Sequence, residues 1–219
     1  TLFLMRIALS QQRVLRNQVF YIVIVFLFLF SALRFEVGCD WQGYVYQYLA
    51  ADVLDWSDPS IGLEPIWWAI LLGITEMGWP YPIINVISSA VFFVGILIIA
   101  RRQPDPLGFL VLLFPILIIN MPMSGIRQGA AIGLICIAFV AFIDRRPVLF
   151  SLWVLVATGF HFSAIIFFSL LPFATGKYTK KRVFLTIILA IPGLFFILLF
   201  SAFDAISRYV DTSIEAAGA

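Results

Sequence analysis

The sequence contains several separate apolar runs of about 17–25 residues, the length that an α-helix needs to cross the hydrocarbon core of a bilayer. Strands of a membrane barrel would be shorter and would alternate between apolar and polar residues. With 63% hydrophobic and 12% charged residues, the chain is an integral membrane protein with a predicted all-α fold. Its net charge of +2 comes from basic residues at the ends of the runs, which follow membrane topology and do not indicate nucleic-acid binding.

We expect one transmembrane domain, 1–219, with spans over residues 19–34, 81–100, 107–120, 123–143, 148–173 and 183–203. Residues 35–62 contain no Lys or Arg, which predicts an external loop. The apolar segment 63–78 is short and precedes a span that ends in Arg101 and Arg102. If this pair is cytoplasmic, as the positive-inside rule predicts, the segment is short or re-entrant; otherwise the pair lies outside, against that rule. The chain begins on Thr1 and ends on small residues. This pattern is consistent with a fragment of a longer protein and makes the helix count a lower bound.

The apolar segment 148–173 has two alternative interpretations. It is interrupted by polar residues near Gly159 and is followed by the basic residues Lys177, Lys180, Lys181 and Arg182. If this basic cluster is cytoplasmic, the segment enters the membrane, breaks near Gly159 and returns; if it is external, the segment is one long helix. A break at membrane depth is tolerated only where it lines a protein-enclosed or water-filled cavity.

Arg127 lies in the apolar run 121–143, where a charge costs roughly 2.5–3.5 kcal/mol near a helix centre and less toward an end. Three glycines recur at every fourth position from Gly125 to Gly133, a face that lets a neighbouring helix approach closely. At about 100° per residue, Arg127 falls nearly opposite this face, beside Ser124 and Gln128. The pattern predicts a cation that faces a polar cavity or an anionic partner. The alternative is an arginine that snorkels to the membrane boundary.

His161 is the single histidine, and it lies within an apolar segment. An ionisable residue in such a place indicates a functional site, and histidine titrates near neutral pH. The alternative is a neutral imidazole that donates to a carbonyl of the next helix. Arg34 could join Arg127 in clamping a phosphate, because the guanidinium fork matches phosphate oxygens; taken alone, it is a helix-end charge.

Two carboxylates are candidates for a general base on a hydroxyl. Asp40 follows the first span closely, and Glu64 opens the next apolar segment; either could serve if its surroundings raise its pKa. The aromatic residues of 35–62, Tyr44 among them, fit stacking on sugar rings and a membrane-interface belt equally well. Cys39 and Cys136 have no metal-ligand spacing, so we expect no metal and no cofactor.

The pattern R-x-x-x-G-x-D-x-x-x-Y, from Arg34 to Tyr44, resembles a motif of the EpsG-type exopolysaccharide polymerase family. Three further blocks of that family occur in the same order: Glu64-Pro65 before an apolar helix, Ser124–Gln128, and His161–Ala164. Each block is short, so the specificity lies in their order and spacing between Phe20 and Leu171. The residues carried over by this resemblance are Arg34, Asp40, Glu64, Arg127 and His161.

The resemblance implies a role similar to that of Wzy-type O-antigen polymerases. It implies a GT-C-like polytopic helix bundle with re-entrant or broken helices around an external-facing cavity, in the bacterial inner (cytoplasmic) membrane. The reaction would transfer a glycan from a polyprenyl pyrophosphate to another lipid-linked repeat unit, without a metal. Arg127 and Arg34 would bind the pyrophosphate, with Ser124, Gln128 and Tyr44 as further substrate-binding candidates. Asp40, Glu64 or His161 would deprotonate the attacking hydroxyl.

The implied partners are polyprenyl-pyrophosphate-linked oligosaccharides, membrane lipids and other polysaccharide assembly proteins such as a flippase or a chain-length regulator, with no nucleic acid. A transporter or flippase for an anionic or lipid-linked substrate is the main alternative. In that case Arg127 would bind the solute and the broken segment 148–173 would be a gate. A structural membrane subunit is a third interpretation, but it does not explain Arg127 and His161.

Overall fold

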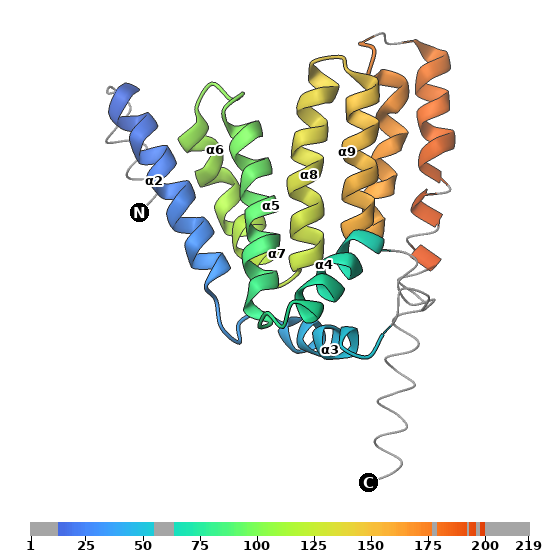
Figure 1. Ribbon diagram of the computed structural model, residues 1–219. Helices are drawn as coiled ribbons and strands as arrows, with labels where there is room; N and C mark the ends of the chain where they lie inside the picture. The colour runs from blue at the N-terminus through green and yellow to red at the C-terminus, as the bar shows by residue number, and fades with distance from the viewer. Residues whose placement is uncertain (1–12, 55–63, 177–178, 192, 196–197, 200–219) are drawn as a thin grey trace.

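The computed structural model describes residues 13–54, 64–176, 179–191, 193–195 and 198–199, and all of its elements in these ranges are helical (Figure 1). They are α2 (Arg13–Ala32), α3 (Trp41–Ala51), α4 (Pro65–Glu76), α5 (Pro82–Ala100), α6 (Pro106–Leu113), the π-helical η2 (Phe114–Ile118), α7 (Ile119–Met123), α8 (Ile126–Ile143), α9 (Pro147–Phe160) and the 3₁₀-helical η3 (Phe162–Phe173). A further helix begins at residue 180.

The predicted all-α membrane fold is confirmed for the described part of the chain. Among the described residues, four helical stretches are long and apolar enough to cross a bilayer: Leu15–Ala32, Pro82–Ala100, Pro106–Met123 and Ile126–Ile143. The third is not a regular α-helix, because Pro115 lacks the N–H for an intrahelical bond and the backbone passes through η2. This stretch ends at Met123, three residues beyond the end of the expected span 107–120.

Residues 35–62 were expected to form a loop, but in the structure Trp41–Ala51 forms the helix α3. Gln47 of α3 accepts a hydrogen bond of 2.9 Å from the indole N–H of Trp67 in α4, and the Tyr44 ring lies edge-on to the Trp67 ring. These contacts dock α3 on α4 at one end of the bundle (Figure 1). Residues 55–62 of the expected loop lie outside the described part of the chain, as do residues 200–203 of the expected last span.

Neither α4 nor α9 is long enough to cross a bilayer alone. At 1.5 Å per residue, the 12 residues of α4 and the 14 of α9 give helices of about 18 and 21 Å, against a hydrocarbon core of about 30 Å. After α9 the chain turns at His161 and η3 runs back beside it (Figure 1). A side chain at Gly176 would meet the Arg145 guanidinium, so the hairpin of α9 and η3 begins and ends at the same face.

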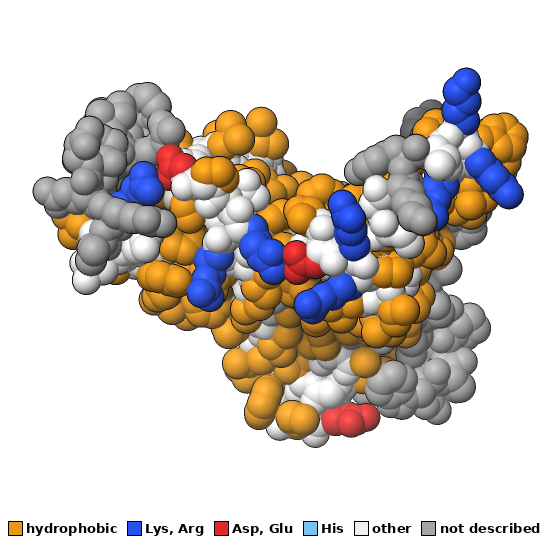
Figure 2. Space-filling model, turned by 90° about the horizontal axis from the view of Figure 1, so that it is seen from above, with side chains coloured by type: hydrophobic (Ala, Val, Ile, Leu, Met, Phe, Trp, Pro, Cys, Tyr) orange, Lys and Arg blue, Asp and Glu red, His pale blue; other side chains and the backbone are white. Residues whose placement is uncertain are grey.

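The bundle therefore has two chemically distinct ends. We call one the arginine end, because Arg101, Arg102, Arg145 and Arg146 lie there and a 2.9 Å salt bridge joins Arg102 to Asp144. Figure 2 looks down on this end and shows Lys and Arg side chains spread across it. We call the other the site end, because Glu64, Arg127 and His161 meet there.

Close packing of α5 on α8 links the two ends. A Cβ added at Gly95 would lie 1.9 Å from the carbonyl oxygen of Gly133, and one at Gly133 would lie 2.6 Å from the backbone of Phe92. The glycine face expected on α8 is therefore present only in part. Gly133 packs on α5 and Gly129 on the Met121 backbone, but Gly125 precedes the first turn of α8, because that helix begins at Ile126.

Candidate functional site

The Glu64 carboxylate is the centre of a polar cluster at the site end. It is buried at the N-cap position of α4 and accepts three hydrogen bonds. Arg127 donates to one oxygen at 2.5 Å; the Nδ1 of His161, at 2.7 Å, and the backbone N–H of Phe162, at 3.2 Å, contact the other. Residues separated by 63 and 97 positions thus meet on one side chain.

The break between α9 and η3 creates two of these contacts. His161 has an extended backbone, with φ −151° and ψ 118°, so the helix stops there, and the first N–H groups of η3 need acceptors outside a preceding helical turn. Glu64 accepts one of them, and its negative charge lies near the positive ends of both η3 and α4. Since a carboxylate only accepts, the Nδ1 of His161 carries a proton, and in the neutral imidazole Nε2 has the lone pair. The side chain is 29% exposed, so a substrate can reach it.

Arg127 is the second residue of α8, and three side chains surround its guanidinium. Glu64 pairs with it, the Tyr44 ring centroid lies 5.6 Å from its Cζ and the Trp67 ring centroid 6.0 Å. Both distances are in the range of cation–π attraction. Its Nε is buried and has no hydrogen-bond partner among the described residues. The side chain as a whole is 29% exposed, so an anionic or polar group of a ligand can approach the guanidinium.

The protonation states follow from these contacts. Burial alone would raise the pKa of Glu64, but the hydrogen bond from His161 and the charge of Arg127 outweigh it and hold that pKa below its usual 4.5. Burial raises the pKa of Tyr44 above 10.0, although the Arg127 charge opposes the shift. At neutral pH the site therefore contains an ionised Glu64 and a neutral Tyr44 phenol.

Arg34 lies at the same end of the bundle, but its donors are engaged by the protein itself. Its guanidinium is buried and donates to the carbonyl oxygen of Pro122 at 2.6 Å and to the Asn85 side chain at 3.0 Å. The Pro122 carbonyl also accepts a hydrogen bond from Ser31. These bonds join the end of α2 to α5 and α7. A clamp formed by Arg34 and Arg127 together stays a prediction, and the described contacts favour an anchoring role for Arg34.

The remaining sequence candidates lie around this cluster. Asp40 is exposed at the N-cap of α3, and its charge acts on Tyr44. The Ser124 hydroxyl accepts the backbone N–H of Cys39 at 3.1 Å and so holds the turn after α2 against the start of α8. Gln128 is exposed beside Arg127. These contacts leave substrate-binding roles for Asp40 and Gln128 as predictions.

Trp67 is a site residue that sequence reasoning missed. It is fully buried and contacts Tyr44, Gln47 and the Arg127 guanidinium. Its position three residues after Glu64 places both on one face of α4, and this spacing was the signal available in the sequence. Within the described ranges, no cluster of three or more His, Cys, Asp and Glu side chains is placed to hold a metal ion.

Comparison with known proteins gives one match. A sequence model of the EpsG family matches residues 17–219, nearly the whole chain. No curated protein and no solved structure matches.

Proposed function

Since this chain belongs to the EpsG family, we propose that it polymerises lipid-linked oligosaccharide repeat units in the synthesis of a surface polysaccharide. It would transfer a growing glycan from a polyprenyl pyrophosphate to a hydroxyl of another lipid-linked repeat unit. The observation that carries this proposal is the contact of Glu64 with both Arg127 and His161. This cluster combines an oriented base with a cation, the two groups that transfer from a pyrophosphate requires.

The base in this proposal is His161. Glu64 holds the Nδ1–H of the imidazole, which fixes the tautomer and turns the Nε2 lone pair outward, the same division of roles as in carboxylate-oriented histidine bases. Nε2 accepts the proton of the acceptor hydroxyl as its oxygen bonds to the anomeric carbon of the donor. The resulting imidazolium is stabilised by the Glu64 carboxylate. General base catalysis of this kind contributes roughly 10²–10⁴-fold.

Arg127 stabilises the leaving group. The bond between the anomeric carbon and the pyrophosphate oxygen breaks, and the electron pair leaves with the pyrophosphate. The partly exposed Arg127 guanidinium meets this developing charge with donors that Glu64 does not use. The neutral Tyr44 phenol, Ser124 and Gln128 are candidates for binding the glycan or phosphate oxygens. Asp40 is the second candidate base, and Arg34 positions the backbone of α7 just before α8. No metal ion is required in this scheme.

The membrane orientation follows from the arginine end. Lys and Arg are enriched on the cytoplasmic side of membrane proteins, so we place Arg101, Arg102 and Arg146 at the cytoplasmic surface. The site end then faces the exterior of a bacterial inner membrane, where lipid-linked repeat units are available. Other polysaccharide assembly proteins, such as a flippase or chain-length regulator, would act beside it.

Complementation tests the proposal. Cells that lack the native gene receive wild type, Arg127→Ala, His161→Ala or Glu76→Gln, an exposed residue at the far end of α4 that serves as the control. At equal membrane levels, wild type and the control should restore long glycan chains, and the two site variants should leave single repeat units. Long chains from both site variants would refute the assignment of the site.

A transporter or flippase is the second candidate, and the hairpin of α9 and η3 favours it because short re-entrant segments line many transport pathways. The reaction product separates the two functions. In detergent, without a gradient, a polymerase lengthens lipid-linked glycans, whereas a transporter leaves them unchanged.

A further inference from the structure

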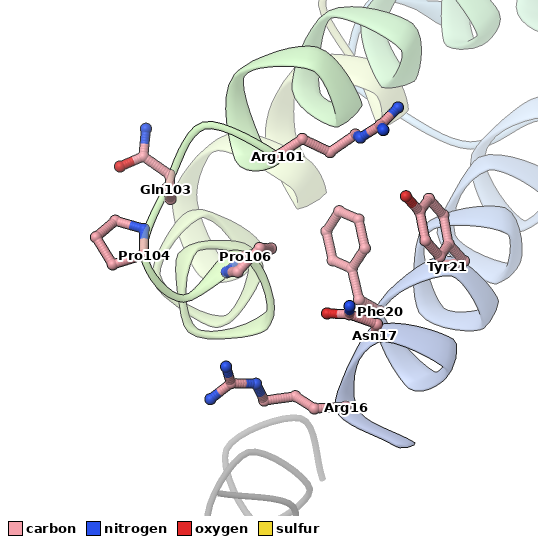
Figure 3. A pocket seen from close by; sticks show the side chains of 8 residues that line it. All are labelled: Arg16, Asn17, Phe20, Tyr21, Arg101, Gln103, Pro104 and Pro106. Atoms are coloured by element: carbon pink, nitrogen blue, oxygen red, sulfur yellow. The ribbon is translucent and has the colours of Figure 1, made fainter. Parts of the chain in front are cut away.

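A polar cavity lies at the arginine end, at the opposite end of the bundle from Glu64. It has a volume of about 280 Å³ and opens between the first turns of α2 and the turn that joins α5 to α6 (Figure 3). Its lining consists of Arg16, Asn17, Phe20, Tyr21, Arg101, Gln103, Pro104 and Pro106. Two cations, two amides and a phenol therefore line one recess that has no carboxylate in its wall.

The two arginines of this cavity lack the partners that other cations of the same end have. Arg102 forms a salt bridge with Asp144, but neither Arg16 nor Arg101 has an ion pair among the described residues. The Nε of Arg16 is buried and without a hydrogen-bond partner in the same part of the chain. Figure 3 shows the two side chains at opposite sides of the cavity, Arg16 from α2 and Arg101 from the end of α5, with Phe20 and Pro106 between them. Their positive charges favour an anion in the cavity, and guanidinium groups match phosphate oxygens best.

An apolar groove continues from the cavity along α6. The two share Gln103 and Pro104, and the groove is lined further by Asp105, Gly108, Phe109, Val111 and Leu112. Leu112 is 74% exposed, and on the other side of the cavity Ile22 of α2 is 68% exposed. Apolar side chains this exposed on membrane-crossing helices face lipid. The cationic recess thus opens onto a surface that suits an acyl chain.

We propose that the cavity between Arg16 and Arg101 binds the phosphate headgroup of an anionic membrane lipid, with an acyl chain in the groove along α6. The shared chemistry is a phosphate oxyanion held by two guanidinium groups. The groove favours a lipid over a soluble phosphate, because a free phosphate has no use for an apolar surface next to its site. The site is independent of the Glu64 cluster and of the reaction proposed for it.

Native mass spectrometry of the full chain in detergent tests this assignment. The protein is titrated with short-chain phosphatidylglycerol, with phosphatidylcholine of the same chain length, and with inorganic phosphate. Three variants accompany wild type: Arg16→Gln/Arg101→Gln, the charge-retaining Arg16→Lys/Arg101→Lys, and Arg146→Gln/Lys181→Gln. The last removes two exposed charges of the same protein outside the cavity and serves as the control.

We expect wild type to bind phosphatidylglycerol at one site, and the double glutamine variant to bind it about 30-fold more weakly, since each basic residue near a membrane surface contributes a factor of about five in affinity. The control should keep the wild-type affinity within about threefold, because exposed charges outside the cavity are screened. The affinity of the lysine variant should fall between those of wild type and the double glutamine variant, which shows that the lost charge rather than misfolding weakens binding. Equal binding of phosphatidylcholine, or equal loss in the control, would overturn the proposal. Binding of inorganic phosphate without phosphatidylglycerol would overturn the lipid assignment.

Discussion

Replacing Glu64 by glutamine removes the charge at the centre of the site and changes little else in shape. The glutamine keeps one carbonyl oxygen, but its amide group must then face either Arg127 or the protonated Nδ1 of His161, and both are donors. One of two strong hydrogen bonds is therefore lost, and the Arg127 guanidinium keeps its charge without a counter-ion. The isosteric substitution isolates the electrostatic role of this carboxylate.

The magnitude follows from the burial of the pair. Loss of one partner of a buried ion pair destabilises a protein by about 3–5 kcal/mol. Because the Arg127 side chain is 29% exposed, solvent screens part of its charge and we expect about 3 kcal/mol, the lower end of that range. Arg127→Met should have a similar effect. The double variant should also lose about 3 kcal/mol rather than the sum of about 6, because each single variant already removes the same interaction.

Unfolding in mixed micelles of mild detergent and sodium dodecyl sulfate measures these free energies. Glu76→Gln is the matched control, since the same substitution at the exposed end of α4 should change stability by less than about 0.5 kcal/mol. If the two single variants are additive to within about 0.5 kcal/mol, Glu64 and Arg127 do not interact as described. In an in vitro polymerisation assay, Glu64→Gln should also lower kcat by about 10²-fold or more, because the imidazolium that forms on His161 loses the carboxylate charge that stabilises it.

Three further predictions concern stability. The pKa of Glu64 lies below its unfolded value of 4.5. The extra folding stability of wild type over Glu64→Gln should therefore be complete above pH 4.5 and should disappear as the pH falls through the lower folded pKa. A stability difference that does not change with pH would contradict this. Gly95→Ala should lower stability by about 1–3 kcal/mol because its Cβ would overlap the Gly133 backbone. Gly73→Ala is the contrasting case, because a Cβ there meets nothing within 4 Å, and it should raise stability by about 0.5–1 kcal/mol. Thermal melts of the purified protein measure both changes. Arg34→Leu removes two buried charged hydrogen bonds and should destabilise by about 3 kcal/mol; a variant of unchanged stability but no activity would instead assign Arg34 to substrate binding.

The sequence supports the individual site candidates better than their arrangement. Arg127, Glu64 and His161 each stand out because an ionisable side chain in an apolar segment needs a partner, and the all-α membrane fold follows from the length of the apolar runs. Their mutual contact could not be derived, since it depends on where α9 breaks and on how the short α4 packs. Both are set by tertiary contacts such as that of Ile66 with Gly159.

The hydrogen bonds of Arg34 could not be predicted from the sequence either. Its acceptor is a backbone carbonyl, that of Pro122, which has no signature among side-chain types. A helix at Trp41–Ala51 was not expected because the apolar residues there are mostly aromatic and suited a membrane-interface belt equally well. Contacts of Tyr44 and Gln47 with Trp67 define that helix, and such contacts appear only once α4 is in place.

The three partners of Glu64 have a consequence for how the protein is made. Synthesis proceeds from the N-terminus, so Glu64 enters the membrane well before Arg127 and almost a hundred residues before His161 and Phe162. Until the hairpin of α9 and η3 is in place, the nascent chain carries a buried carboxylate that lacks two of its three donors. Chains arrested before Phe162 should therefore be unstable in the membrane and prone to proteolysis. The hairpin of α9 and η3, which is synthesised after the other parts of the site, thus completes the hydrogen bonding of Glu64 and stabilises the assembled bundle.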